Sequence, residues 1–427
     1  MTTPPAGTAL PGNRWDLLAG VRPDVPPMVS VVVAHYRQPQ QLARTLAALR
    51  RQDHPSHRLE VIVADDGSPE RPRVPDDVVL VRQEDAGFRL AAARNLGAAA
   101  ATGEILVFLD ADTTPEPAFV RELVRLPALA PDCVTVGRRR HARLDGVPVT
   151  EDIELAVAGR ELVEPPWLRE AYRTSRNLLD ADDRSYRYVI GAALACSRRL
   201  FAEVGGFDET FTSYGGEDWE WAYRAWIGGA LLAHAPTAVA WHDGPDASER
   251  PAAGRSAKNA EAIRLSDLIP VPGSRGRGLR SAKVDVAVSG PPAPATPADV
   301  FVSVDSVLAA IPGAEATESE TGTRAPLGRG RFDRVRVHLD ILRPVLVVGG
   351  ALAAQVSHVG RGQLGELLIV DDAGTELIRI SSMRSRARHL RWARDDLFSR
   401  GRATCDGVRA LEGEVDVEAY LGGWTRG

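Results

Sequence analysis

The chain has 427 residues, of which 44% are hydrophobic and 26% charged, a composition ordinary for a globular protein of two or three domains. Its net charge of −5 gives no overall reason to expect nucleic acid as a partner. The 3 cysteines are scattered and show neither a disulfide framework nor metal-ligand spacing, so we expect a cytoplasmic protein. No apolar run reaches the roughly 18 residues of a membrane span. Peripheral membrane contact and a homo-oligomer both stay open.

The first half of the chain alternates between strand and helix patterns. Residues 1–27 are rich in proline and lack an apolar core, which predicts a flexible arm and no signal peptide. Apolar runs then predict strands over 28–34, 60–64, 78–82 and 105–109, and helical spacing predicts helices over 39–51 and 88–102. Thr114 and Pro115 are typical of the N-cap and first residue of a further helix. This alternation predicts an α/β domain with a mostly parallel sheet.

The second half is less regular. Helices are predicted over 197–204 and from Trp219 to the Gly228–Gly229 pair, with a short strand over 238–241. We expect a first domain over 28–269 and a Gly/Pro/Ser/Arg-rich linker over 270–297. Residues 298–427 should form a smaller β-rich or α+β domain. Its predicted elements are strands over 300–304, 335–339 and 345–348, a hairpin over 367–380 and an Arg-rich helix over 382–398.

Two carboxylates follow the most apolar strand of the first half. Residues 103–112 read Gly-Glu-Ile-Leu-Val-Phe-Leu-Asp-Ala-Asp, so Asp110 and Asp112 stand at the carboxyl end of a buried strand. Open α/β sheets place their ligands at that edge. Two acidic side chains there suit a hard divalent cation, and a cation suits a diphosphate. A lone Asp-X-Asp that merely caps a loop is the plain alternative.

A second acidic pair follows the strand over 60–64. Asp65 and Asp66 precede Gly67 and Ser68, and such residues commonly form turns. A carboxylate at this position can also accept a hydrogen bond from a nucleotide base, including the N3–H of uracil. Both interpretations are open from these residues alone.

Several motifs in order resemble the family 2 glycosyltransferases of GT-A fold, over about residues 28–245. They are Val-Ser-Val-Val-Val-Ala-His-Tyr (29–36), Ala-Asp-Asp-Gly-Ser (64–68), Ala-Arg-Asn-Leu-Gly (93–97), Phe-Leu-Asp-Ala-Asp (108–112), Gly-Gly-Phe-Asp-Glu (205–209) and Gly-Gly-Glu-Asp-Trp-Glu (215–220). Each motif is weak alone, and their order makes the resemblance specific. The C-terminal domain resembles no family that we identify.

The resemblance implies a GT-A nucleotide-sugar-binding domain and a donor site. Asp112 would bind Mn²⁺ or Mg²⁺, and Asp110 would face the ribose or a metal-bound water. Asp65 and Asp66 would contact the base, which favours a UDP-sugar. The resemblance also implies further donor contacts, made by the backbone of Ala34 to Tyr36 at the base and by Arg94 near the diphosphate.

The same resemblance assigns the chemistry to the Glu217–Asp218 pair. Asp218 would act as the general base that takes a proton from the acceptor hydroxyl, and Glu217 would orient the acceptor or support the loop. Direct displacement would invert the anomeric centre. His242 would complete the metal site, as a histidine does at this point in related enzymes, with His234 as the competing candidate. Asp218 as a simple helix cap is the alternative.

Aromatic residues near this pair are candidates for the acceptor side. Tyr214 and Trp219 could stack on sugar rings, although the helical stripe that holds Trp219 also suits a core position. Family members often carry an asparagine where residues 189–194 read Val-Ile-Gly-Ala-Ala-Leu, so contacts to the donor sugar or to the acceptor should differ here.

Together these features predict a metal-dependent, inverting glycosyltransferase of the hexosyl- or N-acetylhexosaminyltransferase class. Its donor would be a nucleotide-sugar, and its acceptor a glycan, lipid-linked sugar, peptide or small metabolite. Two rivals are a sugar nucleotidyltransferase and a non-catalytic sugar-nucleotide binding protein. The first would usually carry a Gly-rich basic loop after the first strand, which residues 34–40 lack. A non-catalytic binding protein would not need the metal ligands or the base, whereas Asp110, Asp112, Asp218 and His242 are all present in this chain.

Overall fold

We describe a computed structural model of the chain, covering residues 4–245, 253–317 and 327–422. The chain forms two compact units. The first domain comprises Pro5–Trp226 and Ala230–Ile263, and the second is mainly Arg264–Gly427 with the short segments Met1–Pro4 and Ile227–Gly229. Among the described residues, no helix combines the length and the apolar character needed to cross a bilayer.

A nine-stranded sheet organises the first domain, in the order β3-β2-β1-β4-β8-β6-β9-β5, with β7 paired to β6. Strands β3, β2, β1 and β4 run parallel, β8 is antiparallel to both neighbours, and β6 and β9 are parallel again. The expected α/β class is therefore confirmed. The strands are β1 (Val29–His35), β2 (Leu59–Asp65), β3 (Val79–Arg82), β4 (Ile105–Asp110), β5 (Thr113–Pro115), β6 (Cys133–Ala142), β7 (Glu161–Leu162), β8 (Ala193–Ser197) and β9 (Leu231–Asp243).

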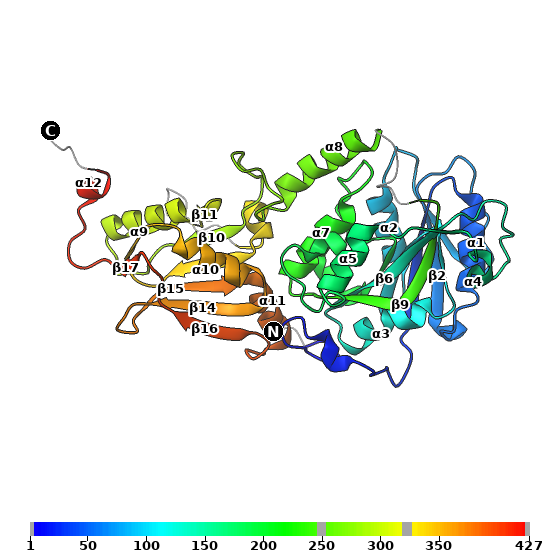
Figure 1. Ribbon diagram of the computed structural model, residues 1–427, viewed down its shortest axis with the longest axis horizontal. Coiled ribbons are helices and arrows are strands. Elements are labelled where there is room, and N and C mark those ends of the chain that lie inside the picture. Colours follow the sequence, from blue (N-terminus) through cyan, green and yellow to red (C-terminus); the bar gives the residue numbers. More distant parts are fainter. Residues whose placement is uncertain (1–3, 246–252, 318–326, 423–427) are drawn as a thin grey trace. The chain divides into compact units, whose positions relative to one another are not determined.

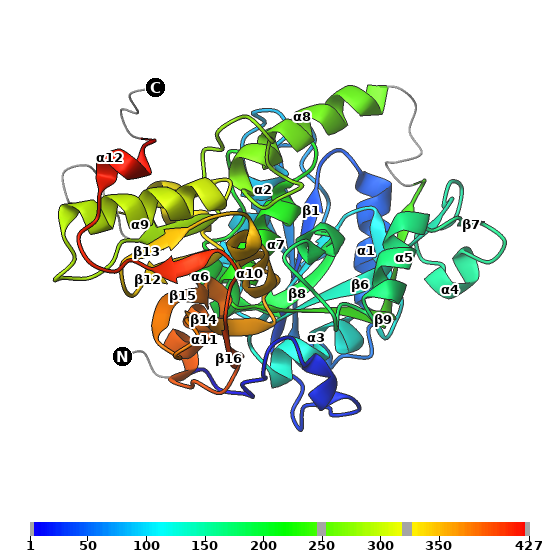
Figure 2. The same cartoon turned by 60° about the vertical axis from the view of Figure 1, so that its left-hand side comes forward.

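Helices cover both faces of this sheet, which explains why its central strands β1 and β4 are buried along almost their whole length. Side chains of α1 and α3 share one core cluster with Val31, Val107 and their neighbours of the same face. On the opposite face α2 packs closely, since a Cβ at Gly97 would lie 2.3 Å from Cγ1 of Val32, and Figure 2 shows α1 and α2 on either side of β1. The helices are α1 (Pro39–Leu49), α2 (Leu90–Ala100), α3 (Phe119–Leu129), α4 (Ile153–Ala156), α5 (Pro166–Thr174), α6 (Arg198–Val204), α7 (Glu217–Ile227) and α8 (Ala253–Leu268), with 3-10 turns η1 (Trp15–Leu18), η2 (Ser56–Arg58) and η3 (Ser185–Tyr188).

The N-terminal segment is part of the first domain, so the predicted flexible arm over 1–27 is wrong for its described residues. Leu10 is buried in a cluster with Leu126 and Leu231. Asn13 is 1% exposed; its Nδ2 donates to the carbonyls of Leu178 (2.6 Å) and Leu232 (3.0 Å), and its Oδ1 accepts from the N–H of Leu232 (2.9 Å). One buried amide thus ties the segment to two distant parts of the chain, which composition alone could not indicate.

Asn13→Ala should lower the free energy of unfolding by about 1–3 kcal/mol, because buried backbone groups lose their partners. Urea unfolding of the full chain measures this. Arg14→Ala removes an exposed ion pair with Asp16 and should change stability by less than about 0.5 kcal/mol. Equal effects of the two substitutions would show that Asn13 does not anchor the segment.

The second domain is built on a six-stranded mixed sheet, in the order β11-β10-β12-β15-β14-β16 (Figure 1). Residues of α9 and α10 pack on the apolar face that Val337, Leu339 and Ile380 present. The smaller C-terminal domain is therefore α+β, within the prediction. Its elements are β10 (Val286–Ser289), α9 (Pro297–Ala310), β11 (Ala314–Ala316), η5 (Gly330–Arg334), β12 (Val337–Ile341), β13 (Val345–Val347), α10 (Ala351–Gly360), β14 (Leu364–Val370), β15 (Glu376–Ser382), α11 (Met383–Trp392), β16 (Ser399–Ala403), β17 (Val408–Ala410) and α12 (Val417–Tyr420).

Three predicted boundaries and elements are corrected. The linker over 270–297 contains β10, a buried strand paired on both sides in the second sheet, so the second domain begins earlier than predicted. The strand over 300–304 is helix α9, begun by a capping box between Thr296 and Asp299. Thr114 and Pro115 do not start a helix but form β5, and α3 begins at Phe119.

Candidate active site

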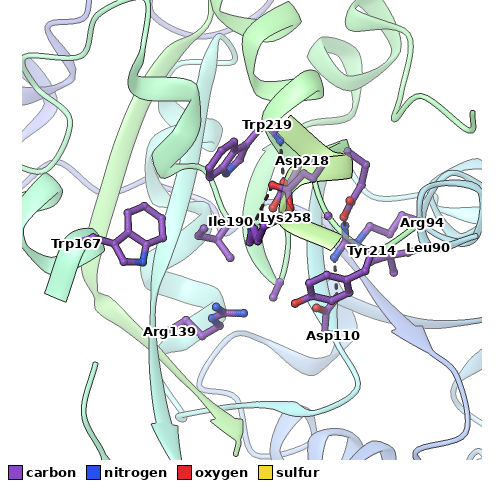
Figure 3. A pocket seen from close by; sticks show the side chains of 15 residues that line it. Leu90, Arg94, Asp110, Arg139, Trp167, Ile190, Tyr214, Asp218, Trp219 and Lys258 are labelled. Atoms are coloured by element: carbon purple, nitrogen blue, oxygen red, sulfur yellow. Dashed lines mark hydrogen bonds and ion pairs between the residues drawn. The ribbon is translucent and has the colours of Figure 1, made fainter. Parts of the chain in front are cut away.

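The carboxyl ends of β1, β2 and β4 meet at one edge of the first sheet. Register pairs Ala34 with Asp110 and His35 with Asp65, so these strand ends lie side by side. A cavity of about 350 Å³ opens near this edge, and six of the predicted site residues line it (Figure 3). They are Arg94, Asp110, Tyr214, Glu217, Asp218 and Trp219.

Arg94 joins two acidic residues that are distant in the sequence. Its two terminal nitrogens donate to Oδ1 of Asp110 and to Oε1 of Glu217, each at 2.8 Å, and its side chain is 2% exposed. Burial alone would lower the pKa of Arg94, but the charges of Asp110 and Glu217 outweigh burial and raise it. A Cβ at Gly191 would lie 2.7 Å from a terminal nitrogen of Arg94, so glycine there leaves room for the guanidinium. Arg94 therefore positions both carboxylates, and direct contact with a diphosphate stays a prediction.

Glu217 and Asp218 stand in the first turn of α7, after Gly215 and Gly216, which have φ of +94° and +95°. Oδ2 of Asp218 accepts from the N–H of Gly191 at 2.9 Å, which fixes this carboxylate at the cavity. Burial raises the pKa of Asp218, although that hydrogen bond opposes the shift. Oε2 of Glu217 is buried and has no hydrogen-bond partner among the residues that the structure describes. The pair thus offers two carboxylates whose protonated forms are unusually favoured.

Asp112 and His242 face one another next to β5. Nδ1 of His242 lies 3.1 Å from the carbonyl oxygen of Gly244, which can only accept, so the ring proton resides on Nδ1. In the neutral ring, the lone pair of Nε2 is then directed outward, and Nε2 lies 3.7 Å from Oδ2 of Asp112, too far for a hydrogen bond. Gln38 donates to the same Oδ2 at 2.9 Å and orients the carboxylate.

Nε2 of His242 and Oδ2 of Asp112 are two facing electron-pair donors, and a divalent cation fits between them. The bond from Nδ1 to a carbonyl supports this interpretation, because metal-bound histidines usually donate their other N–H to a carbonyl or a carboxylate. Within the described ranges, no three His, Cys, Asp or Glu side chains are grouped as a metal site. Two protein ligands suit Mg²⁺ or Mn²⁺, which also bind substrate phosphates and water. His234 is eight residues from His242 along β9, roughly 25 Å of strand. It stacks on Tyr172 with ring centroids 3.7 Å apart, so it is not the competing ligand.

The predicted base-binding pair divides into two different environments. Asp65 is 0% exposed and accepts from the hydroxyl of Ser68 at 2.6 Å, with Nδ1 of His35 at 2.8 Å. Its assignment as a base contact therefore does not fit the structure. Asp66 is 6% exposed, and its oxygens also have partners: Oδ1 accepts from the amide of Gln83 and Oδ2 from the N–H of Arg89 at 2.8 Å. Burial raises the pKa of Asp66. Tyr36, which donates to Asp85 at 3.1 Å, is the more open candidate.

Comparison with known proteins identifies the family of the first domain. Residues 30–205 match the model of glycosyl transferase family 2, and residues 179–237 match that of the N-terminal domain of galactosyltransferase. The first domain is a family 2 glycosyltransferase domain.

Relatives of this domain share about a third of its residues. Chondroitin synthase of Escherichia coli is 31% identical over 268 residues, which is 57% of this chain and 38% of that protein. Validoxylamine A glucosyltransferase of Streptomyces hygroscopicus subsp. limoneus is 34% identical over 222 residues, or 46% of this chain and 48% of that protein. The chain therefore spans half or less of the length of these relatives.

Solved structures are more distant. A mannosyltransferase from Pyrobaculum calidifontis in complex with GDP-Man and Mn²⁺ is 21% identical, with a TM-score of 0.39, and covers 60% of this chain and 67% of that one. GalNAc-T7 with UDP, GalNAc and Mn²⁺ is 18% identical, with a TM-score of 0.40, and covers 58% and 52%.

Both predicted aromatic residues, Tyr214 and Trp219, line the cavity of the glycosyltransferase domain. Tyr214 is 53% exposed and packs edge-on against Phe88 at 6.0 Å. Trp219 also lines the cavity, whereas Trp226, about two helical turns further on, is fully buried. Trp219 therefore lies at the edge of the apolar stripe that the sequence suggested.

Sequence reasoning missed several residues that line the same cavity. They are Arg139 on β6, Trp167 on α5, and Lys258 and Glu261 on α8. Lys258 donates to Oε2 of Glu261 at 2.9 Å, which accounts for one charged pair at the rim. Lys258 is one of the two lysines in the chain. That rarity was the signal in the sequence that could have drawn attention to it.

A pH prediction follows from Glu217. Burial, followed by the charge of Asp218, raises the pKa of Glu217 to about 7 from an ordinary value of 4.5. Because the folded state holds this proton more tightly than the unfolded chain, Glu217 stabilises the fold fully below about pH 4.5, and that contribution is lost as pH rises through about 7. Urea unfolding of Glu217→Gln should therefore show a flatter pH dependence across this window than the wild type. Exposed Glu154→Gln is the control, and an unchanged profile in Glu217→Gln would contradict the assignment.

Proposed function

We propose that this chain is a metal-dependent, inverting glycosyltransferase that moves a hexosyl or N-acetylhexosaminyl group from a UDP-sugar to an acceptor hydroxyl. The observation that carries the proposal is the carboxylate of Asp218, held by Gly191 at the cavity that Arg94 and Asp110 also line. The names of the relatives add support, since they describe synthesis of chondroitin and glucosyl transfer to validoxylamine A.

The reaction needs a base beside the acceptor. The acceptor O–H gives its proton to Asp218, its oxygen bonds to the anomeric carbon, and the bond from that carbon to the diphosphate oxygen breaks. Attack opposite the leaving group inverts the anomeric centre. Burial raises the pKa of Asp218, which makes its carboxylate a stronger base. Arg94 keeps Glu217 and Asp110 in place beside it.

Asp112 and His242 would hold the metal ion, Mn²⁺ or Mg²⁺. Such an ion, when bound, neutralises charge on the departing nucleotide diphosphate. Gln38 and the carbonyl of Gly244 fix the two ligands in orientation. The nucleotide base would be lined by Asp66, Tyr36 and the backbone at Ala34. The carboxylate of Asp66 would accept a hydrogen bond from the N3–H of uracil.

Nucleotide binding tests the donor class. Calorimetric titration of the full chain with UDP, GDP and CDP, in the presence of Mn²⁺, should show a preference for UDP. Tighter binding of GDP or CDP would overturn the UDP assignment. A second assay supplies UTP and a sugar 1-phosphate. Release of pyrophosphate in that assay would show that the protein is a nucleotidyltransferase instead. A non-catalytic binding protein would bind UDP-sugars without consuming them.

A further inference from the structure

The cavity of the glycosyltransferase domain has two unlike walls. Arg94, Asp110 and Asp218 form a polar wall, Trp167, Ile190 and Ala192 contribute an apolar one, and Arg139 also lines the cavity. Figure 3 shows Trp167 on the opposite side of the cavity from Arg94, with Ile190 lying between Trp167 and Asp218. A ligand that fills this space must therefore have one apolar face and one polar edge.

Trp167 lines the cavity from the first turn of α5. It is the second residue of α5, directly after Pro166, which is pre-set for the first helical position. Its ring lies 6.5 Å from that of Tyr188, whose carbonyl accepts from the hydroxyl of Tyr172 at 2.7 Å. Nevertheless Trp167 is 43% exposed. A large aromatic ring that stays open to solvent beside catalytic carboxylates is characteristic of a binding surface.

The apolar wall includes two residues of the segment 189–194. Ile190 and Ala192 lie on either side of Gly191, whose N–H holds Asp218. The segment that positions the proposed base thus also supplies apolar surface to the acceptor side. A side chain with an amide at 190 or 192 would offer hydrogen bonds there, and these two residues offer contact area instead.

We propose that Trp167 and Ile190 form a platform for the ring of a saccharide or cyclitol acceptor. One C–H face of the ring stacks on Trp167, and a hydroxyl at the ring edge then faces Asp218. Pyranoses and carbocyclic polyols combine an apolar face with a polar edge, which matches the two walls. An aryl alcohol lacks the polar edge, and a peptide hydroxyl lacks the flat face. This inference rests on the proposed function and names the acceptor class of that site.

Kinetics with defined acceptors test the platform. The full chain is given the UDP-sugar that it consumes fastest, with methyl pyranosides, myo-inositol, benzyl alcohol or a serine peptide as acceptors. Trp167→Ala should raise the acceptor KM by about tenfold or more and lower the ratio of transfer to hydrolysis, because water needs no ring stacking. Trp167→Phe should recover most of the loss. Val163→Ala, an exposed apolar residue that does not line the cavity, should match the wild type. Preference for benzyl alcohol or the peptide would overturn the proposal.

A binding measurement keeps the test independent of turnover. Full-length protein labelled with 5-fluorotryptophan gives one ¹⁹F signal per tryptophan, and Trp167→Phe identifies that of Trp167. Millimolar methyl pyranosides or myo-inositol should shift this signal while leaving that of buried Trp226 unchanged. If none of these compounds shifts it, with or without UDP and Mn²⁺, the proposal is wrong. A shift in a protein that consumes no nucleotide-sugar would support the platform and refute the proposed activity.

Discussion

Asp218→Asn should slow glycosyl transfer by about 10²–10⁴-fold, because an amide cannot take the proton of the acceptor hydroxyl. The substitution keeps the size of the side chain and its oxygen, which can still accept from the N–H of Gly191. Affinity for UDP should change little, since the proposed metal ligands, Asp112 and His242, and the proposed base contact Asp66 are other residues. Transfer rate, UDP affinity and melting temperature are measured on the same preparation.

Helix capping gives a different result. If Asp218 only caps α7, the amide substitution should cost about 1 kcal/mol of stability or less and leave transfer near normal. Glu217→Gln is the matched control, because it changes the neighbouring carboxylate in the same way. Transfer that fails in Glu217→Gln and survives in Asp218→Asn would move the base to Glu217.

Asp112→Ala should reduce metal-dependent turnover to the background level. The structure offers two side chains as ligands, so removal of the carboxylate leaves His242 alone, and a single imidazole is a poor partner for Mg²⁺ or Mn²⁺. UDP binding should also lose its dependence on Mn²⁺. Calorimetry with and without Mn²⁺ measures this alongside UDP release.

Two further variants delimit the metal assignment. His242→Ala should weaken Mn²⁺ binding less than Asp112→Ala, because a carboxylate is the better ligand for a hard cation. Exposed Asp145→Ala, in the same domain, should behave as the wild type. Wild-type protein that keeps full activity in excess EDTA would contradict the metal assignment.

The first half of the fold was predictable because its signals are local. The apolar runs of β1, β2 and β4 and the leucine spacing of α1 specify their own structure. Helix α9 was missed because valines between 300 and 304 suggested a strand, while the capping box at Thr296 and Asp299 fixes a helix. The N-terminal segment was misjudged because the buried amide of Asn13 acts on residues more than 160 positions away.

The sequence could predict those cavity residues that belong to recognisable motifs. Asp110 and Asp218 stand at a strand end and a helix start, where position in the element already limits what the side chain can do. Trp167 and Arg139 come from segments without clear periodicity, and only the fold brings them to the cavity. Asp65 shows the converse: it belongs to one of the motifs of the resemblance, but His35 and Ser68 occupy its oxygens.

Consumption of nucleotide-sugars by the full chain tests the central claim most directly. The protein is incubated with a panel of UDP-, GDP- and ADP-sugars in Mn²⁺ or in EDTA, with and without acceptors, and products are identified by mass spectrometry. The account predicts that a UDP-sugar is converted to UDP and a transferred or hydrolysed sugar, in Mn²⁺ and not in EDTA. Intact donors under every metal condition, or conversion that EDTA leaves unchanged, would contradict it.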